Sequence, residues 1–149
     1  MILLVHLLFG AAIGSTVKNI PLAIVLAFLS HYFLDLIPHI DYPVKSTEKN
    51  QWHKILIAFL KVATDICAGI LLILIFSKNQ PIIYICGFAA LIPDGLTVLK
   101  YLIPNQKILE AHYRLHQKIH FLEDKKISKF WRITSQVIVA LISIITLRI

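Results

Sequence analysis

Long apolar segments constrain this chain more than any other feature. Five of them cover most of its 149 residues, and they run over about 1–17, 20–37, 55–77, 81–103 and 130–149. A helix needs roughly 20 apolar residues to cross a bilayer, with a range of about 17–25. A soluble domain of this size has too little interior to bury so many apolar side chains. The sequence therefore predicts an all-α polytopic integral membrane protein, with about five transmembrane helices in a single membrane domain.

The composition supports the same class. Hydrophobic residues make up 58% of the chain and charged residues 15%, whereas soluble domains have about 45–50% and about 25%. The net charge of +7 does not indicate a nucleic-acid partner, because the basic residues lie between the apolar segments. Cys67 and Cys86 lie within apolar segments, so we expect neither a disulfide nor a Cys-ligated metal.

The basic residues are distributed unevenly between the two sides of the predicted membrane domain. If all five segments cross, the side with loops 38–54 and 100–132 carries 11 Lys and Arg, and the other side carries 3. The positive-inside rule then places the N-terminus and both long loops in the cytoplasm, with the protein in the inner (plasma) membrane. Residues 105–128 have apolar side chains at spacings of three, four and seven. This pattern predicts an amphipathic helix on the cytoplasmic membrane surface.

Candidate metal ligands concentrate around the end of the second apolar segment, where His31, Asp35, His39 and Asp41 lie within eleven residues. His31 and Asp35 share a helix face because they are four residues apart. Pro38 weakens the helix, so His39 and Asp41 can project together from an extended segment. Imidazole and carboxylate groups are the usual protein ligands of Zn, Mn and Fe. The four residues therefore predict a metal site.

Ionisable residues in three other apolar segments extend the set of candidate metal ligands to His6, Asp65 and Asp94. Such groups are costly inside a membrane and are candidates for function. Simpler interpretations remain: Asp65 could pair with Lys61, Asp94 could cap a kink at the preceding proline, and His6 could bond to backbone. The seven candidates exceed what one tetrahedral ion takes, so either two ions bind or some of the residues only support the ligands.

The predicted surface helix carries three histidines, at positions 112, 116 and 120, on one face. This face could meet lipid headgroups, or it could act on a substrate. In the second interpretation His116 and His120 transfer protons to the leaving group. Arg114 or Lys118 would then recognise a headgroup phosphate.

Three segments of the chain resemble a known family. They are His6-Leu7-Leu8-Phe9-Gly10-Ala11-Ala12, the run His31…Asp35…Pro38-His39-Ile40-Asp41, and Ile92-Pro93-Asp94. They are similar to small bacterial and archaeal inner-membrane metal-dependent hydrolases, of the LexA-binding, inner-membrane-associated type. Members pair an early His on the first helix with Pro-Asp or Pro-His-x-Asp motifs at cytoplasmic helix ends. The resemblance covers the first hundred residues and implies a metal-dependent hydrolase without defining its substrate.

We therefore expect a hydrolase that acts on a membrane lipid or lipid-linked substrate, specifically a phosphoester, with one or two divalent ions. Zinc is the first expectation, and Mn or Fe are alternatives. Two other classes stay open. A metal or proton transporter would continue its polar residues to the far side of the membrane. A non-catalytic membrane module would use the metal only to join helices, and would show metal-dependent folding without turnover.

Overall fold

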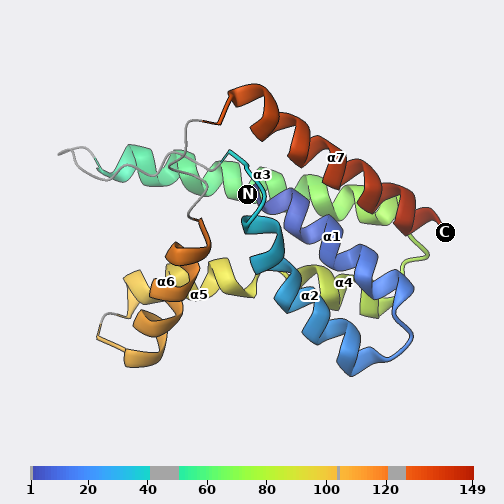
Figure 1. Cartoon of the computed structure of the whole chain (residues 1–149), viewed down its shortest axis with the longest axis horizontal. Coiled ribbons are helices and arrows are strands. Elements are labelled where there is room, and N and C mark those ends of the chain that lie inside the picture. The colour runs from blue at the N-terminus through green and yellow to red at the C-terminus, as the bar shows by residue number, and fades with distance from the viewer. Residues whose placement is uncertain (1, 41–50, 104, 121–126) are drawn as a thin grey trace.

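The computed structural model describes residues 2–40, 51–103, 105–120 and 127–149. Over these residues the chain forms helices joined by short segments and no strands, which confirms the predicted all-α class (Figure 1). The helices are α1 (Leu3–Thr16), α2 (Ile20–Asp35), α3 (Gln51–Phe76), α4 (Pro81–Ala89), α5 (Ile92–Leu102), α6 (Lys107–Ile119) and α7 (Lys129–Arg148).

Helix α1 lies at the centre of the bundle and packs against α2, α3, α4 and α7 (Figure 1). Its face toward α4 carries Gly10 and Gly14, one turn apart. A Cβ atom on Gly10 would lie only 2.6 Å from the carbonyl oxygen of Cys86, and one on Gly14 would lie 2.8 Å from that of Ile82. Small residues at this spacing allow two helix backbones to approach closely in a membrane. The two glycines thus let α1 and α4 meet backbone to backbone.

The first turn of α1 is capped by side chains from other helices. The carboxylate of Asp65, in α3, accepts hydrogen bonds from the backbone N–H groups of Leu3 and Leu4. The side-chain oxygen of Gln136, in α7, lies 3.4 Å from the backbone nitrogen of Ile2 and accepts its proton. The first amides of a helix have no partner within the helix, and leaving them unpaired in apolar surroundings is costly. These acceptors therefore hold the start of α1 in place.

The predicted fourth span is two helices rather than one. Helices α4 and α5 are separated by a short break and differ in direction by 49°. Pro93 explains the break, because it has no N–H for the carbonyl of Ala89 and its ring clashes with that carbonyl. The chain resumes its helix at Ile92, with Pro93 in the first turn, where proline is tolerated. The bend brings Asp94 to the beginning of a new helix.

Two helices are long and apolar enough to cross a membrane, and the bent pair α4 and α5 would make a third. The apolar windows are Phe59–Phe76, with a mean hydropathy of 2.3, and Lys129–Arg148, with a mean hydropathy of 1.7. Most of their side chains lie on the surface of the molecule. Helices α1 and α2 are apolar but have only 14 and 16 residues, which is below the roughly 20 of a typical span. The five-span arrangement stays a prediction.

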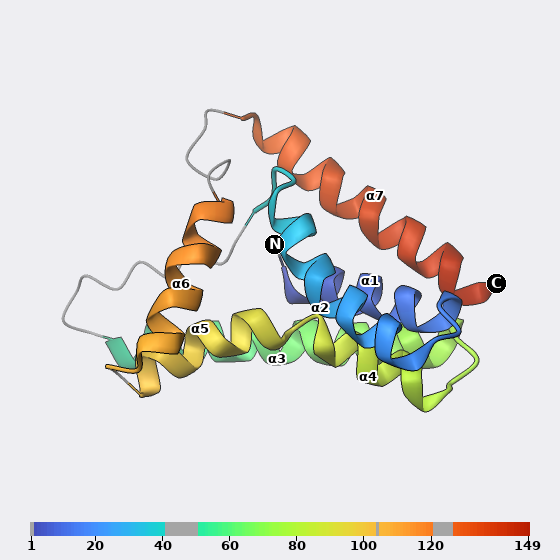
Figure 2. The ribbon, with the colours of Figure 1, turned by 60° about the horizontal axis from the view of Figure 1, so that its bottom comes forward.

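Helix α6 lies across the end of α5 and contacts α5 and α2 (Figure 2). It covers Lys107–Ile119 of the predicted helix over 105–128, of which residues 121–126 lie outside the described part. Its buried side chains are Leu109 and His116, whereas Ile108 is 83% exposed and Leu115 53% exposed. The histidine face of α6 thus turns into the molecule, because polar partners for it lie on α2 and α5.

Candidate metal centre

The buried carboxylate of Asp35, the last residue of α2, is the centre of a histidine cluster. Five imidazole Nε2 atoms lie within 4.0 Å of its two oxygens. The distances are 3.3 Å from His6 and 4.0 Å from His39 to Oδ1, and 3.1 Å from each of His31, His116 and His120 to Oδ2. These imidazoles come from α1, α2, the segment after α2, α6 and the residue that follows α6. Residues more than a hundred positions apart therefore meet at one carboxylate.

The predicted helix face of α2 accounts for the first part of this cluster. His31 and Asp35 are four residues apart, and their side chains meet on one face of α2. The chain leaves the helix before Pro38, whose carbonyl accepts a hydrogen bond from the hydroxyl of Ser135 in α7. His39 follows directly and turns its Nε2 back toward Asp35.

Asp94 supplies a second carboxylate from the first turn of α5. Its Oδ1 lies 3.5 Å from Nε2 of His31 and 3.8 Å from Nε2 of His116. The break before α5 gives it this position, because a continuous helix would direct residue 94 elsewhere. Its side chain is 30% exposed, whereas His31 is fully buried. Asp94 is therefore the most exposed of the described side chains in the cluster.

Backbone carbonyls determine which ring nitrogen carries the proton in two of the histidines. Nδ1 of His31 lies 2.8 Å from the carbonyl oxygen of Ala90, and Nδ1 of His39 lies 2.6 Å from that of Ile37. A carbonyl oxygen only accepts, so Nδ1 must donate in both. In its neutral form each ring then turns an Nε2 lone pair toward Asp35, and in its protonated form Nε2 donates to that carboxylate. Outer hydrogen bonds of this kind orient the histidine ligands of protein metal sites.

The same reasoning applies to His116 through a hydroxyl group. Its Nδ1 lies 3.1 Å from Oγ1 of Thr97, and this hydroxyl donates to the carbonyl of Pro93 at 3.2 Å. Since the hydroxyl proton is already used, Oγ1 accepts from Nδ1 of His116. Neutral His31 and His116 therefore point lone pairs at each other, with their Nε2 atoms 3.0 Å apart beside a carboxylate that also only accepts. A divalent cation among these atoms, or a proton on one of the facing nitrogens, removes the conflict.

His6 shows the same need for a partner. Its ring is fully buried, and neither nitrogen makes a hydrogen bond to the described residues, although Nε2 lies 3.3 Å from Asp35 Oδ1. The ring stacks on that of His31, with centroids 4.1 Å apart. A buried polar atom without a hydrogen bond is costly, and a metal ion at Nε2 would satisfy it.

Three sets of described residues bring potential ligand atoms within 4.8 Å of one another. They are His6, His31 and Asp94; His31, Asp35 and His116; and Asp35, His39 and His120. The structure thus brings together five of the seven predicted metal ligands, and it adds two histidines from α6 and the residue after it. These buried groups are compatible with a metal site.

The remaining predicted residues lie elsewhere. Asp65 belongs to none of the three sets and instead caps α1, and Asp41 lies outside the described residues. Arg114 is on the exposed face of α6, where its Nε donates to Glu110 at 3.1 Å. This pair holds the pKa of the Glu110 carboxyl below its ordinary value, with a further contribution from Lys100. Arg114 is therefore not part of the cluster.

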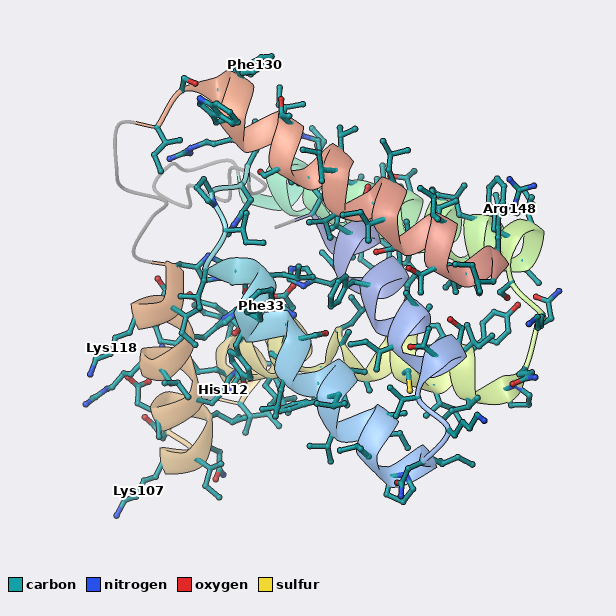
Figure 3. All side chains as sticks on the ribbon, turned by 45° about the vertical axis from the view of Figure 1, so that its right-hand side comes forward. Phe33, Lys107, His112, Lys118, Phe130 and Arg148 are labelled. Atoms are coloured by element: carbon teal, nitrogen blue, oxygen red, sulfur yellow. The ribbon has the colours of Figure 1, made fainter. Side chains whose placement is uncertain are left out.

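The three histidines that share one face of α6 have different environments. His112 donates from Nε2 to the carbonyl of Pro93 at 3.0 Å and accepts at Nδ1 from the Tyr32 hydroxyl at 3.2 Å. Both of its nitrogens are satisfied by protein, and Figure 3 shows the residue between α6 and the helices it docks against. His116 and His120, which the sequence suggested for proton transfer, direct Nε2 at Asp35. Their positions fit metal ligands.

Sequence reasoning overlooked Thr97 and Tyr32, which orient His116 and His112. Nothing in the sequence indicates that Thr97 contacts His116 or that Tyr32 contacts His112, although Thr97 lies one turn after Pro93.

No protein-family model, curated protein or solved structure matches this chain.

Proposed function

We propose that this protein is a membrane-embedded metal-dependent hydrolase that acts on a lipid or lipid-linked phosphoester at the cytoplasmic side of the membrane. The observation that carries the proposal is the pair of facing Nε2 atoms of His31 and His116, 3.0 Å apart beside Asp35. Neutral imidazoles and carboxylates are a donor set that suits zinc, and Mn or Fe are compatible with it. When bound, such an ion polarises a phosphoryl oxygen and lowers the pKa of water.

The proposed reaction needs only water and the ester. The oxygen of water bonds to phosphorus, the P–O bond to the lipid alcohol breaks, and the alcohol leaves with a proton from water. The protein holds the phosphoryl group near Asp94, the exposed edge of the cluster. The other side chains of the cluster are buried, so they exclude bulk water from the remaining sides of the site.

The position of the cluster in the chain supports the cytoplasmic side. His6 lies near the start of α1, and Asp35 ends α2. These two helix ends face the long basic loops in the predicted five-span arrangement, and the positive-inside rule assigns such loops to the cytoplasm. The lysines at both ends of α6, Lys107 and Lys118, point away from the bundle (Figure 3). Basic side chains there suit an anionic lipid surface.

The transporter alternative is less well supported. Beyond His6, the interior between α1, α3, α4 and α7 is filled by an apolar cluster. Its buried residues are Leu7, Leu8, Ala11, Ala12, Ile73, Ile83 and Leu147. An ion pathway would need polar groups through this region. We therefore favour a centre that is reached from one side.

Metal analysis combined with turnover tests the proposal. The full chain would be purified in detergent without chelator, its metal content measured, and phosphate release followed from mixed micelles of phosphatidic acid. We expect at least one equivalent of Zn, Mn or Fe, and activity that chelator removes and metal restores. A well-folded protein without metal would contradict the centre. Bound metal without release of phosphate would support the alternative of a purely structural metal.

A further inference from the structure

The cluster contains more ligands than one ion accepts. Seven described side chains contribute to it, five imidazoles and two carboxylates. Zinc in proteins takes about four ligands, and the octahedral metals take about six. Most of the imidazoles are inaccessible to water; the most exposed is His120, at 12%. A single ion would therefore leave at least one of the seven side chains uncoordinated.

Two of the three ligand sets share no residue. His6, His31 and Asp94 form the first, and Asp35, His39 and His120 form the second. The remaining set, His31, Asp35 and His116, takes one residue from each of them. Each set brings its potential ligand atoms within 4.8 Å of one another. A single ion at either of the two sets that share no residue would leave the other set without an ion.

Asp35 belongs to the second set and also lies close to the first. Its Oδ1 is 3.3 Å from His6 and 4.0 Å from His39, so this oxygen has one neighbour from each set. Its Oδ2 is 3.1 Å from His31 and from His120, again one from each. A carboxylate with this arrangement of neighbours can serve two cations at once.

His116 also lies between the two sets. Its Nε2 is 3.0 Å from that of His31 and 3.4 Å from that of His120. It can therefore join either set and complete its coordination.

We propose that the centre holds two divalent ions, one on His6, His31 and Asp94 and the other on His39 and His120, with Asp35 shared between them. This inference rests on the proposed function, because it assumes that the cluster binds metal. It also defines the substrate class. Two divalent ions with the two described carboxylates leave two positive charges uncompensated, whereas one ion with the same carboxylates leaves none. The two-ion centre therefore favours the dianion of a lipid phosphomonoester over a singly charged diester.

The number of ions is measured on the full chain loaded with Mn²⁺ in detergent. We expect two equivalents and the electron paramagnetic resonance spectrum of an exchange-coupled pair. One equivalent with the spectrum of an isolated ion would overturn the two-ion centre but leave the metal centre of the proposed function standing. No bound Mn²⁺, and no Zn²⁺ or Fe²⁺ in parallel loadings, would overturn both.

Variants test the division into sets. His6→Gln affects the first set alone and His39→Gln the second alone, so each should lower the content from two equivalents to about one and abolish the coupled spectrum. Glu110→Gln, on the exposed face of α6, is the control and should keep both ions. Circular dichroism shows whether each variant is folded. Folded variants that both retain two ions, or that both lose two, would overturn the assignment.

The substrate class has its own measurement. Phosphatidic acid and phosphatidylmethanol are a phosphomonoester and a phosphodiester with the same lipid tails. The Mn²⁺-loaded protein should hydrolyse the first at least ~10-fold faster than the second. Equal rates, or faster hydrolysis of the diester, would overturn the preference for a dianion.

Discussion

Nε2 of His31 and Nε2 of His116 lie 3.0 Å apart, although 85 residues separate them in the chain. Both rings donate from Nδ1, one to the carbonyl of Ala90 and the other to the hydroxyl of Thr97. Each ring thus uses its Nδ1 proton in a hydrogen bond on its outer side, and the two Nε2 atoms face each other on the inside. Such an arrangement is favourable when a cation, either a metal ion or a proton, lies between the two facing nitrogens.

The membrane orientation follows from the distribution of basic residues and can be tested by cysteine labelling. Cys67 is first replaced by alanine, since it is exposed and Cys86 is buried. A membrane-impermeant maleimide added outside intact cells should modify Asn79→Cys and leave Ser128→Cys unmodified. In broken cells both should react. Labelling of residue 128 from outside would reverse the orientation and move the centre away from the cytoplasm.

The contact between α1 and α4 should tolerate no side chain at Gly10. A Cβ there meets backbone, at 2.6 Å from the Cys86 carbonyl oxygen, so the helices must separate. We expect Gly10→Ala to destabilise the protein by about 1–3 kcal/mol and to lower metal content, because α1 carries His6. Gly95→Ala is the control, since nothing lies within 4 Å of its Cβ position. Thermal unfolding in detergent measures both, and equal stability of the two variants would contradict the close contact.

The local part of the site could be predicted from sequence. His31 and Asp35 meet because they are one helical turn apart in an apolar segment, and spacing alone shows that. The cost of placing ionisable groups in a membrane also singled out His6 and Asp94. The glycines at positions 10 and 14 carry a signal for close helix packing that can be read directly from their spacing.

The rest of the site depends on contacts between segments that are distant in the sequence. Asp65 has the same residue type and a similar apolar setting to Asp94, yet it caps α1, because the first amides of that helix lie beside it. His112 and His116 share one helix face, but the carbonyl of Pro93 takes the proton of His112 Nε2, whereas Nε2 of His116 meets Asp35. The spacing of these residues in the sequence predicts neither difference.

Asp65 should behave as a helix cap and not as a ligand. In Asp65→Asn the amide oxygen can still accept from the start of α1, so metal content should stay at the wild-type level. Asp65→Ala removes the acceptor and should destabilise the protein by about 0.5–2 kcal/mol, the usual cost of losing a cap. Metal analysis and thermal unfolding separate these effects. Loss of metal in a folded, stable Asp65→Asn variant would return Asp65 to the set of ligands.

His116 should act as a metal ligand. We expect His116→Ala to lower metal affinity at least ~10-fold, and Thr97→Val to lower it by about 10-fold, because removal of an outer hydrogen bond weakens a histidine ligand. Leu115→Ala, at an exposed neighbour on α6, serves as the control. Full metal affinity in both His116→Ala and Thr97→Val, with turnover reduced by about 10²–10⁴-fold in the first, would instead identify His116 as a proton donor.

Removal of the metal should release α6 from the bundle. The helix buries a single apolar side chain, Leu109, and among the described residues it contributes to none of the apolar core clusters. Its attachment relies on polar contacts, and two of these, from His116 and His120, end at the proposed ions. Without a cation the facing acceptors lose their common partner. The contacts that remain are those of His112 with Tyr32 and Pro93 and contacts with α5 alone, such as the Lys100–Glu110 ion pair at 3.2 Å, so we expect α6 to separate from α2.

Distances between spin labels, measured by double electron–electron resonance, can detect this release. Labels at Lys118→Cys on α6 and Thr16→Cys on α1, with Cys67 replaced by alanine, should give one narrow distance distribution in the metal-loaded protein. Chelator should broaden it, and added metal should restore it. A control pair at Thr16 and Lys78, at the other end of the bundle, should not change in either condition. If the α6 distance stays narrow after complete removal of metal, the protein contacts alone dock the helix, and its histidines do not depend on an ion for their position.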